Sequence, residues 1–225
     1  MDRIPKFALE NRRLVARARS KPPVTVDALS PCDVAVKRSQ QAIASLLPQL
    51  DAQKRAVPSP LHNHASVALA VRVGEVGVLL GADLEETGDE NSGWTAVLAN
   101  CELPEPLSVF KVPHHGSENG DQPRVWNEAL IESPWALVAP FVWGRHELPR
   151  ESDRQRIRSY TENAYLSASS ERKHRKRARA VEKTLEQLGS VPVNADPPMG
   201  QVRLRTPVDE PDGWGVELFG PAFRF

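Results

Sequence analysis

The sequence is poor in the residues that would assign it quickly to a protein class. It has two cysteines, Cys32 and Cys101, which are too few for a disulfide framework and form no recognised metal-binding spacing. Aromatic residues make up 6% of the chain, and no apolar run approaches the roughly 20 residues that a membrane helix needs. Two lone thiols, without a membrane span or the apolar core of a signal peptide, predict a cytoplasmic protein.

An excess of charge of one sign is also missing. Twenty-nine basic residues balance 29 acidic ones, so the net charge is zero. This balance argues against a protein whose whole surface binds nucleic acid. One local basic run, on a helix predicted over residues 171–188, leaves nucleic-acid contact open beside the plainer interpretation of a solvated helix face. Its candidate contact residues are Arg172, Lys173, Arg175 and Lys176.

Proline is abundant, at 20 residues, which predicts many loops and short helices. Residues 1–23 predict a basic tail or a frayed helix, and residues 24–225 predict one folded domain. Strands are expected over 24–29, 66–73, 76–80, 107–112, 135–142, 165–168 (an edge strand), 191–193, 202–205 and 214–219, and helices over 33–53, 94–100, 125–133, 151–163 and 171–188. Gly74-Glu75 separates two β-branched runs as a hairpin turn does. Alternating strands and helices with one hairpin predict an α/β domain built on a mixed sheet with flanking helices.

Polar side chains follow several of the apolar strands. Asp83 follows the strand that ends at Leu80, and His114-His115 follow the strand that ends at Val112. His146 follows a third strand, and Asn63-His64 precede the hairpin at the sheet end where Asp83 is expected. Imidazole nitrogens and carboxylate oxygens are ligands for zinc and similar divalent ions. From these residues alone a metal site, a solvated histidine turn and a helix capped by Asp83 all remain open.

Three segments resemble the metallo-β-lactamase-fold hydrolases, in the branch typified by the C-terminal domain of the competence protein ComEC. They are Asn63-His64-Ala65-Ser66-Val67-Ala68-Leu69, Val78-Leu79-Leu80-Gly81-Ala82-Asp83-Leu84-Glu85 and Val109-Phe110-Lys111-Val112-Pro113-His114-His115-Gly116-Ser117. The ending Asn194-Ala195-Asp196, followed by Gly200-Gln201-Val202-Arg203-Leu204, is similar to that branch's closing strand. His146 and Pro149 lie near a Gly-His-Pro turn of the branch, which this sequence matches loosely.

The resemblance implies a metal-dependent hydrolase that acts on a phosphodiester or similar ester. Zinc is the implied cofactor, as one ion or as a pair of divalent ions, zinc or manganese. Asp83 is implied as the metal-bridging carboxylate, His114 as a ligand, and His115 as a second ligand or a group that orients the first. Further implied site-lining positions are Asn63, His64, Ser117 and His146.

The sequence also departs from the family. It lacks the motif His-x-His-x-Asp-His, and positions 1–60 contain no histidine. The resemblance therefore implies only the second half of an αββα sandwich, with one apolar sheet face left uncovered. Three explanations follow: a fragment with an upstream segment, a chain completed by a second polypeptide that supplies the missing ligands, or a degenerate member that binds a protein partner or nucleic acid without catalysis.

Overall fold

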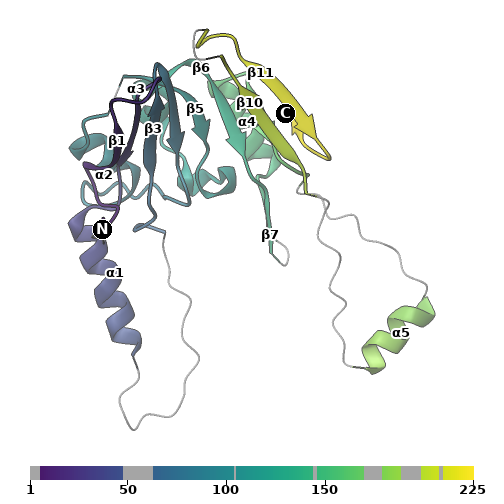
Figure 1. Cartoon of the computed structure of the whole chain (residues 1–225). Helices are drawn as coiled ribbons and strands as arrows, with labels where there is room; N and C mark the ends of the chain where they lie inside the picture. Colours follow the sequence, from purple (N-terminus) through teal and green to yellow (C-terminus); the bar gives the residue numbers. More distant parts are fainter. Residues whose placement is uncertain are drawn as a thin grey trace, which may run out of the picture.

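An eight-stranded mixed sheet forms the body of the protein (Figure 1). The computed structural model describes residues 6–47, 63–103, 105–143, 146–169, 179–188, 199–207 and 210–225. In spatial order the strands of the sheet are β1 (Arg12–Arg17), β2 (Val24–Ala28), β3 (Leu69–Val73), β4 (Val76–Leu80), β5 (Leu107–Lys111), β6 (Leu130–Val138), β9 (Ala164–Leu166) and β12 (Phe223–Arg224). Neighbours from β1 to β4 are antiparallel, those from β4 to β9 are parallel, and β12 is antiparallel to β9. The predicted mixed sheet with flanking helices is thus confirmed.

Five helices and two small hairpins complete the described part of the chain. The helices are α1 (Asp33–Leu46), α2 (Gly93–Asn100), α3 (Pro123–Glu128), α4 (Glu151–Tyr160) and α5 (Arg179–Gln187). The hairpins are β7 (Phe141–Trp143) with β8 (His146–Leu148), and β10 (Gln201–Arg205) with β11 (Gly215–Phe219). Two short 3-10 turns, His114–Gly116 and Glu118–Gly120, follow β5. Among the described helices none is long and apolar enough to cross a membrane.

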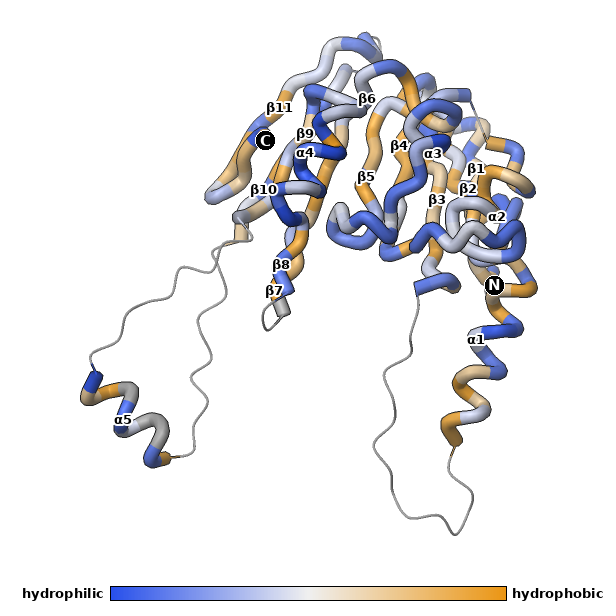
Figure 2. Tube along the Cα trace, turned by 180° about the vertical axis from the view of Figure 1, so that it is seen from behind, coloured by the Kyte–Doolittle hydropathy of each residue, from blue (hydrophilic) through white to orange (hydrophobic). Residues whose placement is uncertain are grey.

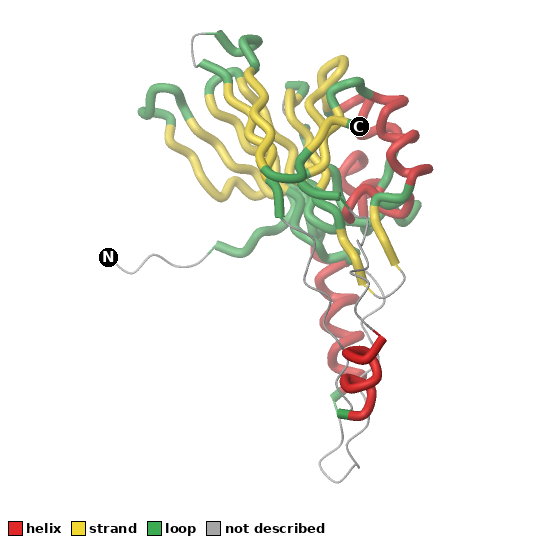
Figure 3. Tube along the Cα trace, turned by 90° about the vertical axis from the view of Figure 1, so that its right-hand side faces the viewer, coloured by secondary structure: helices red, strands yellow, loops and turns green. Residues whose placement is uncertain are grey.

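One face of the sheet carries the main core. Strand pairing aligns Ala70, Leu79, Phe110, Ala136 and Ala164 in one row across β3 to β9, and each is at most 2% exposed. Helices α2, α3 and α4 lie on one side of the sheet (Figure 3). The ring of Phe110 meets two tryptophan rings edge to face, Trp94 of α2 at 6.1 Å and Trp126 of α3 at 5.0 Å between centroids. Burial of these rings and aliphatic side chains is the main stabilising contribution to the fold.

The opposite face is also apolar but only partly covered. Pairing aligns Val26, Val71, Val78, Val109 and Trp135 in a second row, and all but Val109 are partly exposed. The apolar residues lie along the strands in Figure 2. The β10–β11 hairpin covers this face near β6, where the ring centroids of Trp214 and Trp135 are 6.0 Å apart. A sheet with two apolar faces and helices on one of them fits the uncovered face expected from half of a sandwich.

Several predicted elements need correction. Residues 12–17 form the edge strand β1 rather than a tail or helix, because Arg13 and Val15 pair with β2. The helix predicted over 125–133 ends at Glu128, and β6 begins at Leu130, since its chain pairs with β5 from Leu107 onward. The predicted edge strand at 165–168 is β9, which lies between β6 and β12. The predicted strand 191–193 and the first half of the helix over 171–188 lie outside the described residues.

The same substitution at adjacent positions on the two faces should lower the free energy of unfolding by different amounts. Leu79 is fully buried under the helices, and its neighbour Leu80 is partly exposed on the opposite face. We expect Leu79→Ala to lower the free energy of unfolding by about 2–5 kcal/mol. The matched control Leu80→Ala should lower the free energy of unfolding by less than about 2 kcal/mol, because a smaller part of the Leu80 side chain is buried. Urea unfolding at low protein concentration measures both, and equal losses would contradict the difference between the faces.

Candidate functional site

The parallel pairing of β4 and β5 brings the predicted site residues together. Leu80 pairs with Lys111 at the carboxyl ends of the two strands. Beyond that pair, the backbone N–H of Gly81 donates to the carbonyl of Lys111 at 3.0 Å, and the N–H of His114 donates to the carbonyl of Ala82 at 3.0 Å. The turn with Asp83 and the turn with the two histidines therefore lie side by side, although they are far apart in the sequence. A Cβ atom on Gly81 would lie 2.9 Å from the Lys111 carbonyl oxygen, so the approach requires glycine.

The backbone of both turns is strained. Ala82, His114 and His115 have positive φ angles of 46°, 43° and 55°, and Gly116 follows at 80°. A non-glycine residue in this left-handed region costs roughly 1–3 kcal/mol. The histidine turn is closed by backbone hydrogen bonds from Gly116 to Pro113 at 2.8 Å and from Ser117 to His114 at 3.0 Å. Backbone strain of this kind is frequent at functional sites, which favours a functional role for the two turns.

Asp83 lies against His115 rather than His114. The Oδ1 atom of Asp83 is 3.8 Å from Nε2 of His115. The Nδ1 atom of His115 is 3.0 Å from the carbonyl oxygen of Ala139, and a carbonyl can only accept, so Nδ1 carries the proton in that bond. In the neutral ring Nε2 then presents a lone pair toward Asp83. The ring of Phe141 stacks on His115 with centroids 4.9 Å apart and helps to fix its orientation.

Glu85 is a second carboxylate at the site. Its side chain is 11% exposed, and its two oxygens lie 3.4 Å from Nδ1 of His114 and 3.6 Å from Nε2 of His64. The amide of Asn119 donates to Glu85 Oε1 at 3.0 Å. The site thus contains two carboxylate–imidazole groups, Asp83 with His115 and Glu85 between His114 and His64.

Glu85 was not among the predicted site residues. Asp83 was expected to lie near Asn63 and His64, or to cap a helix starting at Leu84, yet residues 84–88 are not helical. The Leu84 side chain is fully buried between the two acidic residues. Acidic residues two positions apart around one buried leucine were the available signal, because alternating side chains of an extended segment share one side.

The described histidines, cysteines and acidic residues do not make a complete metal site. No group of three or more of them is arranged to hold a metal ion. A structural zinc site has four protein ligands, and a catalytic site has three plus water. The two carboxylate–imidazole groups therefore do not fit a resident zinc ion by themselves.

The remaining predicted site residues differ in how close they lie. Ser117 is buried, and its hydroxyl donates to the side chain of Asn119, which also contacts Glu85. Asn63 precedes β3, and its carbonyl accepts from the Ser66 N–H at 3.0 Å. His146 is exposed on β8, paired with Trp143 of β7. The predicted nucleic-acid contacts Arg172, Lys173, Arg175 and Lys176 lie outside the part of the chain that the structure describes.

Lys111 adds a cation beside the carboxylates. It stands on the partly covered sheet face, and its Nζ donates to the carbonyl of Val112 at 3.2 Å. Burial lowers the pKa of its ammonium group, while the negative charge of Asp83 opposes that shift. A lysine beside Asp83 gives this sheet edge one group that favours an anion.

Helix α4 holds the histidine turn in place through Arg156. Its Nη2 donates to the Gly116 carbonyl at 2.6 Å, and its Nη1 donates to the buried carboxylate of Asp153 at 2.8 Å. The Nε atom lies 3.2 Å from Oδ2 of Asp121. A Cβ atom on Gly116 would approach Ile157 of α4 at 3.1 Å, so the helix also packs directly against the turn. Arg156 therefore positions the backbone that carries the two histidines.

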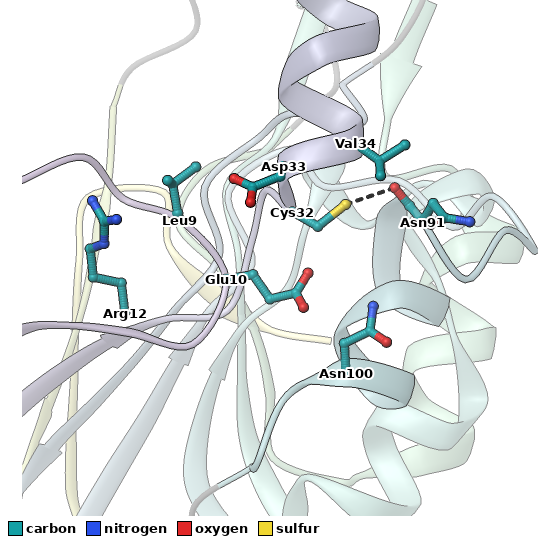
Figure 4. A pocket seen from close by; sticks show the side chains of 8 residues that line it. All are labelled: Leu9, Glu10, Arg12, Cys32, Asp33, Val34, Asn91 and Asn100. Carbon is teal, nitrogen blue, oxygen red and sulfur yellow. Dashed lines mark hydrogen bonds between the residues drawn. The ribbon is translucent and has the colours of Figure 1, made fainter.

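A separate pocket lies where α1 begins (Figure 4). Its volume is about 430 Å³, and it is lined by Leu9, Glu10, Arg12, Cys32, Asp33, Val34, Asn91 and Asn100. The thiol of Cys32 donates to the Asn91 carbonyl at 2.8 Å. Burial and the nearby Asp33 charge raise the pKa of Glu10. No predicted site residue lines this pocket, so it is not the cleft of the carboxylate–imidazole site.

Comparison of the chain with protein-family models, with curated proteins and with solved structures finds no match. The geometry of the two turns and the quoted motifs are therefore the whole basis for a functional proposal.

Loss of Arg156 should disturb both stability and the histidine turn. We expect Arg156→Met to lower the free energy of unfolding by up to about 3 kcal/mol, because it leaves the largely buried carboxylates of Asp153 and Asp121 without their partly buried cation. Imidazole NMR signals of His114 and His115 should shift as well. The control Arg154→Met removes a surface pair with Glu151 and should cost less than about 1 kcal/mol. Unchanged imidazole signals in Arg156→Met would refute the positioning role.

The thiol of Cys101 should react only at high pH. Burial, followed by the negative charge of Glu10, raises its pKa to about 11. In a Cys32→Ser variant, which keeps a good helix cap, the rate of alkylation by iodoacetamide should rise about tenfold per pH unit up to about pH 10. A rate that levels off below pH 9 would show that the thiol is not shielded in this way.

Proposed function

We propose that this chain carries the carboxylate–histidine wall of a metal-dependent hydrolase that acts on a phosphodiester or similar ester. The observation that carries the proposal is the bond between His115 Nδ1 and the Ala139 carbonyl, which turns Nε2 toward Asp83. Histidine ligands of metal sites are commonly oriented by such a bond to a backbone carbonyl. The resemblance of the surrounding segments to metallo-β-lactamase-fold hydrolases supports the reaction class.

The side chains present can orient and activate a water molecule. Oδ1 of Asp83 and Nε2 of His115 are two acceptors separated by 3.8 Å, a gap in which one water can donate to both. Either acceptor can take a proton as that water attacks an ester, and such general base catalysis contributes roughly 10²–10⁴-fold in rate. The ammonium group of Lys111 beside Asp83 would favour an anionic substrate such as a phosphodiester.

Under this proposal an upstream segment or a partner polypeptide adds further ligands to those of the described residues. Two or three ligands leave zinc underbound, so the chain alone should bind metal weakly and turn over little. When bound, a divalent ion would lower the pKa of water and polarise the ester. Asp83, His115 and His114 are the residues of this chain that would face it.

A second candidate function is a non-catalytic interaction module. The observation that favours it is the aliphatic sheet face that the helices leave partly exposed. A degenerate hydrolase that kept this face and lost its other ligands would still bind a protein partner. The basic run at Arg172 to Lys176 keeps nucleic acid as an alternative partner, and steep weakening of binding with added salt would identify it.

The hydrolase proposal predicts weak, site-specific metal binding. We expect the purified chain to bind zinc or manganese in calorimetric titration, and Asp83→Asn or His115→Gln to weaken that binding at least about tenfold, since each removes one of few ligands. Slow hydrolysis of bis(4-nitrophenyl) phosphate should fall in the same variants. His146→Gln is the matched control, because His146 is exposed on β8 outside the two turns.

Two outcomes separate the candidates. In the first, the chain binds neither metal, and the Asp83→Asn and His115→Gln variants behave like the unmodified protein. The two turns then hold no functional site, and the interaction module is the remaining candidate. A loss of binding in His146→Gln equal to that in His115→Gln would mean that the metal is held unspecifically by surface histidines.

A further inference from the structure

The partly covered sheet face carries three aligned rows of aliphatic side chains, bordered by Arg17 of β1 and Lys111 of β5. The central row begins at Val15 of β1 and runs through β2, β3 and β4 to Val109 of β5. Beside it lie a row with Val24, Val73 and Val76 and a row with Leu69 and Leu80. Val73 is 39% exposed, and Val24, Val76, Leu69 and Leu80 are partly exposed. An apolar surface patch of several hundred Å² is often an interaction site.

The face is bounded on one side only. The β10–β11 hairpin stands over β6, where Trp214 meets Trp135, and forms a wall there. On the other side β1 ends the sheet, and in the described ranges no further strand pairs with it. An occupant therefore has to fit beside a wall at β6 and extend over a free edge at β1.

Charges at one end of the sheet are arranged in a complementary way. The β1–β2 turn carries the exposed basic residues Arg17, Arg19 and Lys21. The loop between β10 and β11 carries the exposed acidic residues Glu210 and Asp212. Both lie at the sheet end opposite the carboxyl ends of β4 and β5. Arg17 pairs with Val24 beside the β3–β4 turn, and β10 starts beside Ser167, just past the carboxyl end of the parallel strand β9, and runs away from that end. The basic and acidic groups thus lie at the same end but on opposite sides of the aliphatic face.

We propose that a second copy of this chain covers the face, related by a two-fold axis parallel to the strands. Such an axis exchanges the two sides of the sheet and keeps its ends. It therefore brings the basic β1–β2 turn of each copy toward the acidic β10–β11 loop of the other. Each hairpin wall then flanks the free β1 edge of its partner, and the two aliphatic faces stack at the roughly 10 Å spacing of packed sheets.

The size of the face fits a moderate dimer. Four strands at a spacing of about 4.8 Å, with three rows about 6.8 Å apart, give roughly 400 Å² per copy. The total of about 800 Å² reaches the size of a specific interface together with the contacts of the hairpins and charged turns. We expect a dimer with a dissociation constant on the order of 1–100 µM.

The dimer can be tested apart from the proposed hydrolase, although an upstream segment or partner that completed the sandwich would cover the same sheet face. Its face contains no residue of the carboxylate–imidazole groups, and the same axis leaves both sets of these groups at one end of the assembly. Dimerisation can be measured without metal or substrate. Failure of either proposal can therefore be told from failure of the other.

The test is sedimentation velocity of the chain over a range of concentrations, in the presence of a metal chelator. We expect a monomer–dimer equilibrium that Val78→Lys weakens more than about a hundredfold, because it places an unpaired charge in the apolar interface. The matched control Val34→Lys changes an exposed valine on α1 and should leave the equilibrium unchanged.

A charge exchange keeps the test decisive even if Val78→Lys does not fold. Arg17→Glu with Arg19→Glu should weaken the dimer about tenfold, and so should Glu210→Lys with Asp212→Lys, by repulsion between like charges. All four substitutions together should restore it. A chain that stays monomeric up to about 500 µM, or a dimer that none of these changes weakens, would overturn the proposal.

Discussion

The parallel pairing between β4 and β5 is the contact on which the rest of the structure depends. It joins the antiparallel strands β1 to β4 to the parallel strands β5, β6 and β9. The same pairing continues past the strand ends through the Gly81–Lys111 hydrogen bond and aligns two turns that local geometry could never bring together. Since Leu79 and Phe110 are paired in it, the core beneath the helices and the site at the edge share one register. A slip by one residue would exchange the two faces and separate the turns.

Sequence periodicity predicted most of this frame and failed where tertiary pairing decides. The hairpin at Gly74, strand β5 and helices α1, α2 and α4 followed from local pattern and turn chemistry. Strand β1 was missed because an arginine-rich segment resembles a solvated tail, and only its pairing with β2 makes it a strand. Likewise residues 130–133, predicted as the end of a helix, belong to strand β6, because this strand pairs with β5. Pairing partners distant in the sequence leave no local signal.

The site was predictable in location but not in its pairing. Strand ends and motifs pointed to Asp83, His114 and His115, and the structure brings all three to one edge. The left-handed backbone at Ala82 and at both histidines decides which carboxylate lies next to which imidazole. This conformation could not be predicted from the sequence, because these residue types rarely adopt it. Glu85 was overlooked for the same reason, since its position depends on a turn rather than on a helix.

The strained histidine turn also says something about selection. Glycine or asparagine at positions 82, 114 and 115 would relieve the left-handed backbone and stabilise the fold. Random change under selection for stability alone would therefore tend to remove both imidazoles and the alanine before Asp83. Orientation of His115, by contrast, depends on the backbone carbonyl of residue 139, which side-chain substitutions leave in place. The turn can thus be lost by substitution of its own residues, whereas its support through the carbonyl of residue 139 survives side-chain changes.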